Sequence, residues 1–127
     1  MTEIKVNDTP FNGTIGGAVR IEAPEFTHMP QAGLIPYTAR ITIEYAPRKS
    51  TIDGDSLGEY FATFRDIKLS PEEAVQKICE ELSSACEPMM MNVSSNYTAR
   101  DGVATSPQAR FVHPETQRGQ GPRIQTR

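Results

Sequence analysis

Few side chains of this sequence could do chemistry, and they are scattered. Cys79 and Cys86 are seven residues apart, which on a helix places them on one face about two turns apart and too distant for a disulfide. We expect free thiols that pack in the core. His28 could act as an acid, a base or a metal ligand, but His113 lies near the C-terminus and no cysteine clusters with either, so no metal site is predicted. The run of methionines at 89–91 favours edge-strand and interface packing over a copper or haem site.

Length and charge define the class of protein. The chain has 127 residues, the length of one ordinary domain, and its net charge of -3 is nearly balanced. Such a balance does not indicate nucleic-acid or membrane binding. No apolar run approaches the roughly 18 residues that span a bilayer, and the segment MTEIKVNDTPFNGT lacks the apolar core of a signal peptide. We therefore expect a soluble, cytoplasmic protein.

Alternating apolar residues predict two strands in the first half of the chain. In ARITIEY, the side chains of Ile41, Ile43 and Tyr45 fall on one face and polar side chains on the other. The segment AVRIEA alternates in the same way after the glycine-rich GTIGG, which suits a turn.

Two helices are predicted next. Between residues 56 and 65 the apolar side chains recur at helical spacing: Leu57, Tyr60, Phe61 and Phe64. In SPEEAVQKICEELSSACEP, Ser70 can cap a helix and Pro71 suits its first position. Glu73 completes a capping box with Ser70, and Pro88 ends the helix.

The last elements are two strands and a tail. MMMNVSSNY has Met91, Val93 and Tyr97 in phase, and the Asp-Gly pair of ARDGVAT suits a hairpin turn into a final strand. From about residue 107 the sequence is rich in Gln, Gly, Pro and Arg without an apolar period. We predict one domain over 1–106 and a mobile tail over 107–127.

Two antiparallel hairpins with both helices between them define an α+β fold, in which the helices cover one face of a four-stranded sheet. Such a sheet has open edges. Because closing several subunits into a ring or barrel removes open edges, we expect a homo-oligomer.

Several short motifs, in their order and spacing, carry a resemblance to a known family. They are PEFT, ITIEYAP, SLGEYFATFRD, SPEEAVQKI and YTARDGV, between about Ala23 and Val103. Together they resemble the QueF family, the NADPH-dependent 7-cyano-7-deazaguanine reductases of queuosine biosynthesis. The resemblance implies the tunnelling fold (T-fold), whose four-stranded sheets assemble into an oligomeric barrel.

The resemblance also implies a catalytic cysteine that forms a thioimide with the nitrile, and an acidic aspartate seven residues later. The chain has Pro30 and Tyr37 at these positions, or Met29 in place of Pro30 after a one-residue shift. Neither proline nor methionine can form a thiolate, and tyrosine is a poor proton donor. No catalytic residue is predicted.

The family pattern that implies NADPH binding contains two lysines. Here the segment reads DGDSLGEY, with Asp55 and Gly58 at the lysine positions. A carboxylate repels phosphate, and GTIGG lacks the third glycine and the βαβ context of a dinucleotide fingerprint. No cofactor is expected.

A substrate-binding position is kept in the resemblance. Glu72 matches the glutamate with which the family grips the base, and a carboxylate can accept two parallel N–H bonds from a guanine-like edge. Alternatively, Glu72 only complements the helix dipole as an acid in the first turn. Asp53 stands at the family's glutamate beside the substrate, Ile52 and Gly54 would add backbone contacts, and Pro71 replaces a histidine.

Three hypotheses follow. The first is a QueF-like protein that binds a deazaguanine, guanine or pterin ring through Glu72 without thioimide chemistry. The second is a non-catalytic base-binding or assembly module. The third is a reductase that works by an unrecognised route.

Overall fold

The computed structural model describes residues 4–11 and 15–115 of the chain. The elements follow in the order β1 (Val6–Asp8), β2 (Val19–His28), β3 (Tyr37–Ala46), β4 (Ser50–Ile52), a 3-10 turn (Gly54–Ser56), α1 (Leu57–Ala62), α2 (Pro71–Cys86), β5 (Met90–Tyr97) and β6 (Gln108–Val112). No helix among these residues is long and apolar enough to cross a membrane.

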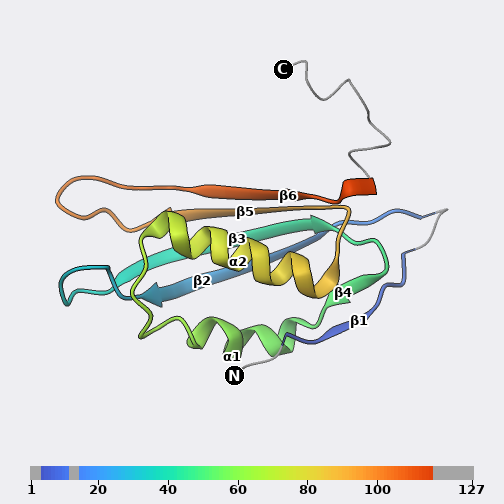
Figure 1. The fold of residues 1–127 in the computed structure, drawn as a ribbon, viewed down its shortest axis with the longest axis horizontal. Coiled ribbons are helices and arrows are strands. Elements are labelled where there is room, and N and C mark those ends of the chain that lie inside the picture. The colour runs from blue at the N-terminus through green and yellow to red at the C-terminus, as the bar shows by residue number, and fades with distance from the viewer. Residues whose placement is uncertain (1–3, 12–14, 116–127) are drawn as a thin grey trace, which may run out of the picture.

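The main sheet has four antiparallel strands in the order β2-β3-β5-β6, so the two hairpins lie side by side. Both helices lie on one face of this sheet, with α2 running across it and α1 beside it (Figure 1). The predicted α+β architecture with two helices inserted between two hairpins is confirmed.

Alternation along β3 produces the core. Ala39, Ile41, Ile43 and Tyr45 are buried on the helical face, while Arg40 is exposed on the other. The strand is central and pairs with both β2 and β5. Burial of its apolar face against the helices is therefore the main source of stability for this layer.

Helix α2 begins with the predicted capping box. The Ser70 hydroxyl accepts from Glu73 N at 3.1 Å, and Glu73 Oε1 accepts from Ser70 N at 2.9 Å. Pro71 is the first helical residue, and the C-cap Glu87 has φ of 47°, in the left-handed region. The buried face of the helix holds Ala74, Val75, Ile78, Cys79, Leu82, Ser83 and Cys86, in addition to Pro71.

Two short strands were not predicted. β1 and β4 form a separate antiparallel pair in the register Val6↔Ile52 to Asp8↔Ser50. Strands of three residues are too short for an alternating pattern to stand out, and their pairing joins segments more than 40 residues apart, which local sequence does not encode.

Strand β2 extends further than predicted, to His28, through a bulge. Its register with β3 shifts between Ala23 and Phe26. The extra residue reverses the phase of the strand. Phe26 and His28 consequently point into the core after Val19 and Ile21 have faced the same side.

The hairpin that joins β5 to β6 contains the predicted turn. Asp101 and Gly102 have φ of 54° and 82°, and the backbone of Arg100 exchanges hydrogen bonds with that of Val103. Positive φ at both central residues is typical of a type I′ turn, for which Asp-Gly is well suited.

Two predictions near the C-terminus are wrong. The tail does not start at residue 107, because Gln108–Val112 form β6 and pair with β5. Ala109 and Phe111 pack on the core, and this short apolar pattern was too brief to recognise. The methionines are also not in an edge strand, since β5 lies between β3 and β6 and Met91 is fully buried. Residues 116–127 of the predicted tail lie outside the described residues.

Candidate functional site

A buried histidine–tyrosine pair lies where β2 and β5 end. His28 Nε2 is 2.7 Å from Tyr97 Oη, and His28 Nδ1 is 3.1 Å from the Met29 carbonyl oxygen. A carbonyl only accepts, so Nδ1 carries the proton of the neutral ring and the Tyr97 hydroxyl donates to Nε2. Burial lowers the pKa of His28 and outweighs the opposing hydrogen bond to Met29. The imidazole is therefore held neutral, with both nitrogens engaged.

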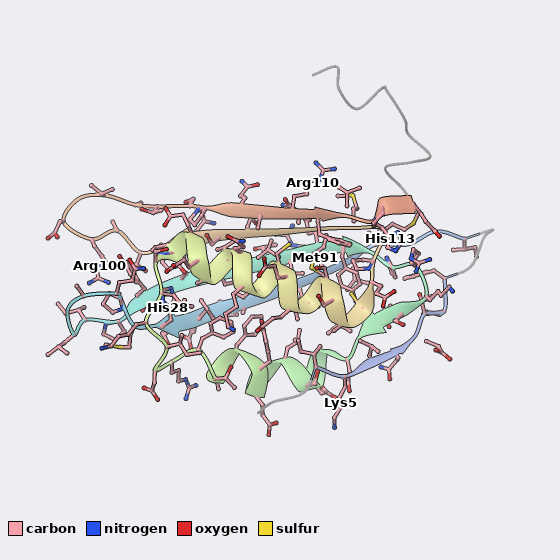
Figure 2. The ribbon with its side chains drawn as sticks, viewed as in Figure 1. Lys5, His28, Met91, Arg100, Arg110 and His113 are labelled. Atoms are coloured by element: carbon pink, nitrogen blue, oxygen red, sulfur yellow. The ribbon has the colours of Figure 1, made fainter. Side chains whose placement is uncertain are left out.

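Two further groups extend this pair towards the surface. The Tyr37 ring lies 5.3 Å from the His28 ring and 5.5 Å from the Tyr97 ring, which it meets edge-on at 89°. The guanidinium carbon of Arg100 lies 4.2 Å from the centre of the Tyr37 ring, within the range of a cation–π contact. Figure 2 shows His28 and Arg100 at the same end of the sheet.

A hollow of about 340 Å³, here called the loop hollow, opens beside these groups. Its lining consists of Pro30, Ala32, Tyr37, Tyr97, Thr98, Arg100, Asp101, Val103 and Thr105. Both positions that the resemblance assigns to catalysis, Pro30 and Tyr37, line this hollow. The lining contains no thiol.

The loop after β2 is tied to the start of α2. Met29 N donates to the Ile67 carbonyl, and the Met29 carbonyl accepts from Leu69 N. The Gln31 side-chain amide donates to Glu73 Oε1 at 2.9 Å. These contacts bring Pro30 close to the first turn of α2, which carries Pro71 and Glu72.

Glu72 is one of two exposed acids in that first turn, the other being Glu73. No hydrogen bond or ion pair within the described part of the chain engages its carboxylate, whereas Glu73 bonds both Ser70 N and Gln31. Burial, followed by the charges of Glu72 and Tyr37, raises the pKa of Tyr97. The Glu72 carboxylate therefore acts electrostatically on Tyr97, and within the described residues it is open to an external donor.

A second hollow of about 430 Å³, here called the α2–β6 groove, includes Glu72. Its lining consists of Glu72, Gln76, Cys79, Glu80, Ser83, Pro107, Gln108, Ala109, Arg110 and Phe111. Cys79 stands two turns along α2 from Glu72, about 10 Å along the helix axis. Burial raises its pKa, so the thiol is protonated and a weak nucleophile. Cys79 and Cys86 are both free and buried, as predicted.

The other predicted ligand residues lie elsewhere. Strand β4, which ends at Ile52 and is followed by Asp53 and Gly54, lies beside the C-terminal end of α2 (Figure 1). Glu72 is at the N-terminal end of that helix. A helix of 16 residues is about 24 Å long. One chain therefore does not bring Asp53 and Glu72 to a single ring-sized ligand.

The groups around Asp53 are also occupied within the chain. Ile52 N donates to Tyr45 Oη at 2.8 Å, and Asp53 N donates to the Lys5 carbonyl at 2.8 Å. Asp53 Oδ1 accepts from Asp55 N at 3.1 Å and caps the 3-10 turn. The Asp53 carboxylate thus has a structural role that the sequence pattern did not indicate.

Gly58, one of the two positions of the family's cofactor lysines, lines a third hollow of about 350 Å³ between β2 and α1, here called the β2–α1 hollow, and Asp55 does not. It is lined by Ile21, Glu22, Ala23, Pro24, Glu25, Phe26, Thr27, Gly54, Leu57, Gly58, Phe61, Ala62 and Arg65. Two carboxylates and one guanidinium are poorly suited to the several phosphate charges of NADPH. No group of three or more His, Cys, Asp or Glu side chains suited to a metal occurs within residues 4–11 and 15–115.

Comparisons with known proteins identify the family. The model of the QueF-like protein family matches residues 36–116. The chain is 38% identical over 86 residues to the NADPH-dependent 7-cyano-7-deazaguanine reductase of Chlorobaculum tepidum, a match that covers 67% of this chain and 73% of the relative. The enzyme of the same name from Chlorobaculum parvum is 40% identical with the same coverage. The chain therefore belongs to the QueF-like family.

A solved structure supports the fold. The apo form of the archaeosine synthase QueF-Like superposes with a TM-score of 0.68 at 17% identity, over 73% of this chain and 91% of that one. The predicted T-fold is confirmed for the single chain.

Sequence reasoning missed the contacts that organise the loop hollow. His28 and Tyr97 are 69 residues apart, and Arg100 reaches Tyr37 across the sheet end. Pairs this distant leave no local periodicity. The available signal was the tyrosine that opens the YTARDGV motif, because its hydroxyl needs a partner when the ring is buried.

Proposed function

We propose that this chain is a QueF-like protein that binds a 7-deazaguanine, guanine or pterin-type ring through Glu72 and performs no thioimide-mediated nitrile reduction. The observation that carries the proposal is the Glu72 carboxylate, which borders the α2–β6 groove and which no hydrogen bond or ion pair engages within the described residues. The separate loop hollow, where the resemblance places the catalytic positions, has no thiol in its lining.

The absence of a nucleophile argues against the chemistry named for the curated relatives. A thioimide needs a thiolate beside the nitrile carbon, and Pro30 lines the hollow where the family resemblance has cysteine. Cys79 is buried and its pKa is raised. Neither thiol of this chain is suited to replace the missing one.

The acid–base groups in and beside the loop hollow favour binding over catalysis. His28 is neutral with both nitrogens hydrogen-bonded, and the pKa of Tyr97 is raised. Such groups exchange protons poorly near neutral pH. This supports the alternative of a non-catalytic base-binding or assembly module, which shares the Glu72 site.

We further propose that NADPH is not a cofactor of this chain. The β2–α1 hollow presents Glu22 and Glu25 beside the single cation Arg65. The proposed ligand is a purine-like small molecule, with no metal.

A closed homo-oligomer completes the proposal. β2 and β6 are the edges of the main sheet, and open edges favour pairing with another chain. The sheet face away from the helices carries the ion pairs Arg20–Glu22, Arg20–Glu44 and Arg40–Glu22, at 2.8, 3.0 and 3.1 Å. A polar face of this kind suits the water-filled interior of a barrel. Within one chain, Asp53 and Glu72 are separated by about the length of α2. Only a second copy of the chain could therefore place its Asp53 segment beside Glu72.

Native mass spectrometry with a panel of 7-deazaguanines, guanine nucleotides and pterins tests assembly and ligand together. We expect a closed oligomer that binds at least one ring of the panel. Intact mass and NADPH absorbance with 7-cyano-7-deazaguanine should show neither an adduct nor turnover, with the Chlorobaculum tepidum enzyme as the positive control. An adduct or nitrile-dependent NADPH oxidation would restore the reductase interpretation, and a monomer without any bound ring would refute the proposal.

A further inference from the structure

Among the described residues, Arg100 is a cation without an ion-pair partner. Its Nη1 is shielded from solvent and has no hydrogen-bond partner in this part of the chain. Over residues 4–11 and 15–115, no carboxylate forms an ion pair with this side chain, although Asp101 lines the same hollow. A guanidinium carries five donors and keeps its charge at every relevant pH. A shielded donor of this kind is unfavourable unless an acceptor reaches it.

The residue under the guanidinium explains the imbalance. Arg100 stacks on Tyr37, 4.2 Å from the ring centre, and the family resemblance places an aspartate at that position. A carboxylate there would lie within reach of the guanidinium and neutralise it. Tyrosine stacks with the cation and leaves its charge in place. The loop hollow is therefore more positive by one charge than the same hollow with aspartate.

We propose that Arg100, held by Tyr37, binds an oxyanion substituent, a carboxylate or a phosphate, on the ring ligand of this protein. The inference rests on the proposed function and specifies its ligand class as anionic. The resemblance to a reductase would instead suggest a neutral nitrile.

The arrangement of the neighbouring groups supports this polarity. Tyr37 and Tyr97 meet edge-on with ring centres 5.5 Å apart, and both line the loop hollow together with Arg100. Glu72 borders the neighbouring α2–β6 groove. A flat ring beside the two tyrosines would direct an oxyanion substituent to the guanidinium.

Calorimetry with matched ligands tests the inference. The 7-carboxylate and 7-cyano forms of 7-deazaguanine share one ring, and guanosine monophosphate against guanosine supplies the phosphate comparison. We expect wild type to bind one of the two anionic ligands at least about 10-fold more tightly than its neutral partner. The pair that shows this preference distinguishes carboxylate from phosphate.

Substitutions at Arg100 and Arg65 test which arginine causes the preference for the anionic ligand. Arg100→Gln should reduce it to less than about 3-fold, and Arg100→Lys should keep part of it, because lysine retains charge without the bidentate fork. Arg65→Gln makes the same charge change in the β2–α1 hollow and should keep the preference whole. If Arg100→Gln fails to fold, a partial loss of the preference for the anionic ligand in Arg100→Lys still tests the role of Arg100.

The two proposals fail in distinguishable ways. Equal affinity for anionic and neutral rings in wild type, or a preference unchanged in the Arg100 variants, would overturn the oxyanion subsite and leave ring binding intact. If no ring binds, the proposed function fails. The subsite is then judged on inorganic phosphate alone, which should raise the melting temperature of wild type and not of Arg100→Gln. No such difference would overturn the subsite as well.

Discussion

Replacing Glu72 by glutamine, with Glu73→Gln as its matched control, separates ligand binding from helix stability. The two glutamates are adjacent in the first turn of α2. Glu73 already accepts hydrogen bonds from Ser70 N and Gln31, whereas Glu72 borders the α2–β6 groove. Both variants lose one negative charge near the same helix end, so only the position of the carboxylate differs.

The two substitutions should differ in their effect on ring affinity and should have similar effects on folding stability. At Glu72, glutamine replaces one acceptor by a donor and removes charge assistance, which should cost about 2 to 4 kcal/mol of ring binding. This corresponds to a loss of roughly 30-fold or more in affinity. The helix-dipole contribution lost in either variant is only about 0.3 to 1 kcal/mol, and glutamine at position 73 can still complete the capping box.

The assay is calorimetric binding of whichever ring the panel identifies, alongside thermal unfolding of the three proteins. Glu72→Gln should lose affinity while Glu73→Gln keeps it to within about 2-fold. Both melting temperatures should fall by no more than about 8 °C. Equal loss of affinity in the two variants, or no loss in either, would show that Glu72 only complements the helix dipole and that the ring site lies elsewhere.

Three further predictions follow from the buried titratable groups. Protons bind the unfolded chain preferentially, because the pKa of His28 is lowered in the folded state. The free energy of unfolding should thus fall as pH drops below about 6.5, by up to about 1.4 kcal/mol per pH unit, until His28 is protonated in the folded state as well. His28→Asn should remove this slope and His113→Asn should keep it; the same slope in all three proteins would contradict the argument. Tyr97→Phe should cost about 1 to 3 kcal/mol in urea unfolding, because it removes the donor to His28 Nε2, and unchanged stability would show that this bond is not needed. Cys79 and Cys86 should react with iodoacetamide at pH 8 only after unfolding, since burial raises both pKa values, that of Cys86 to about 11; rapid alkylation of the native protein, seen by intact mass, would exclude this.

Local sequence determined the elements whose signals repeat within a few residues. The capping box of Ser70 and Glu73, the alternation along β3 and the Asp101-Gly102 turn all appear in the structure as predicted. Each depends on contacts between residues close in the chain, where helical and strand geometry alone decide which side chains meet. The separation of Glu72 from the capping role of Glu73 also follows from spacing within one turn.

Only the tertiary structure decided how the candidate site is composed. The bulge in β2 points His28 into the core, where it meets a hydroxyl 69 residues away, and the β5–β6 hairpin brings Arg100 over Tyr37. The same packing separates Asp53 from Glu72 by the length of α2. These relations depend on strand register and on the layering of helices over the sheet, which are set by burial of the whole apolar surface and leave no periodic trace in the sequence.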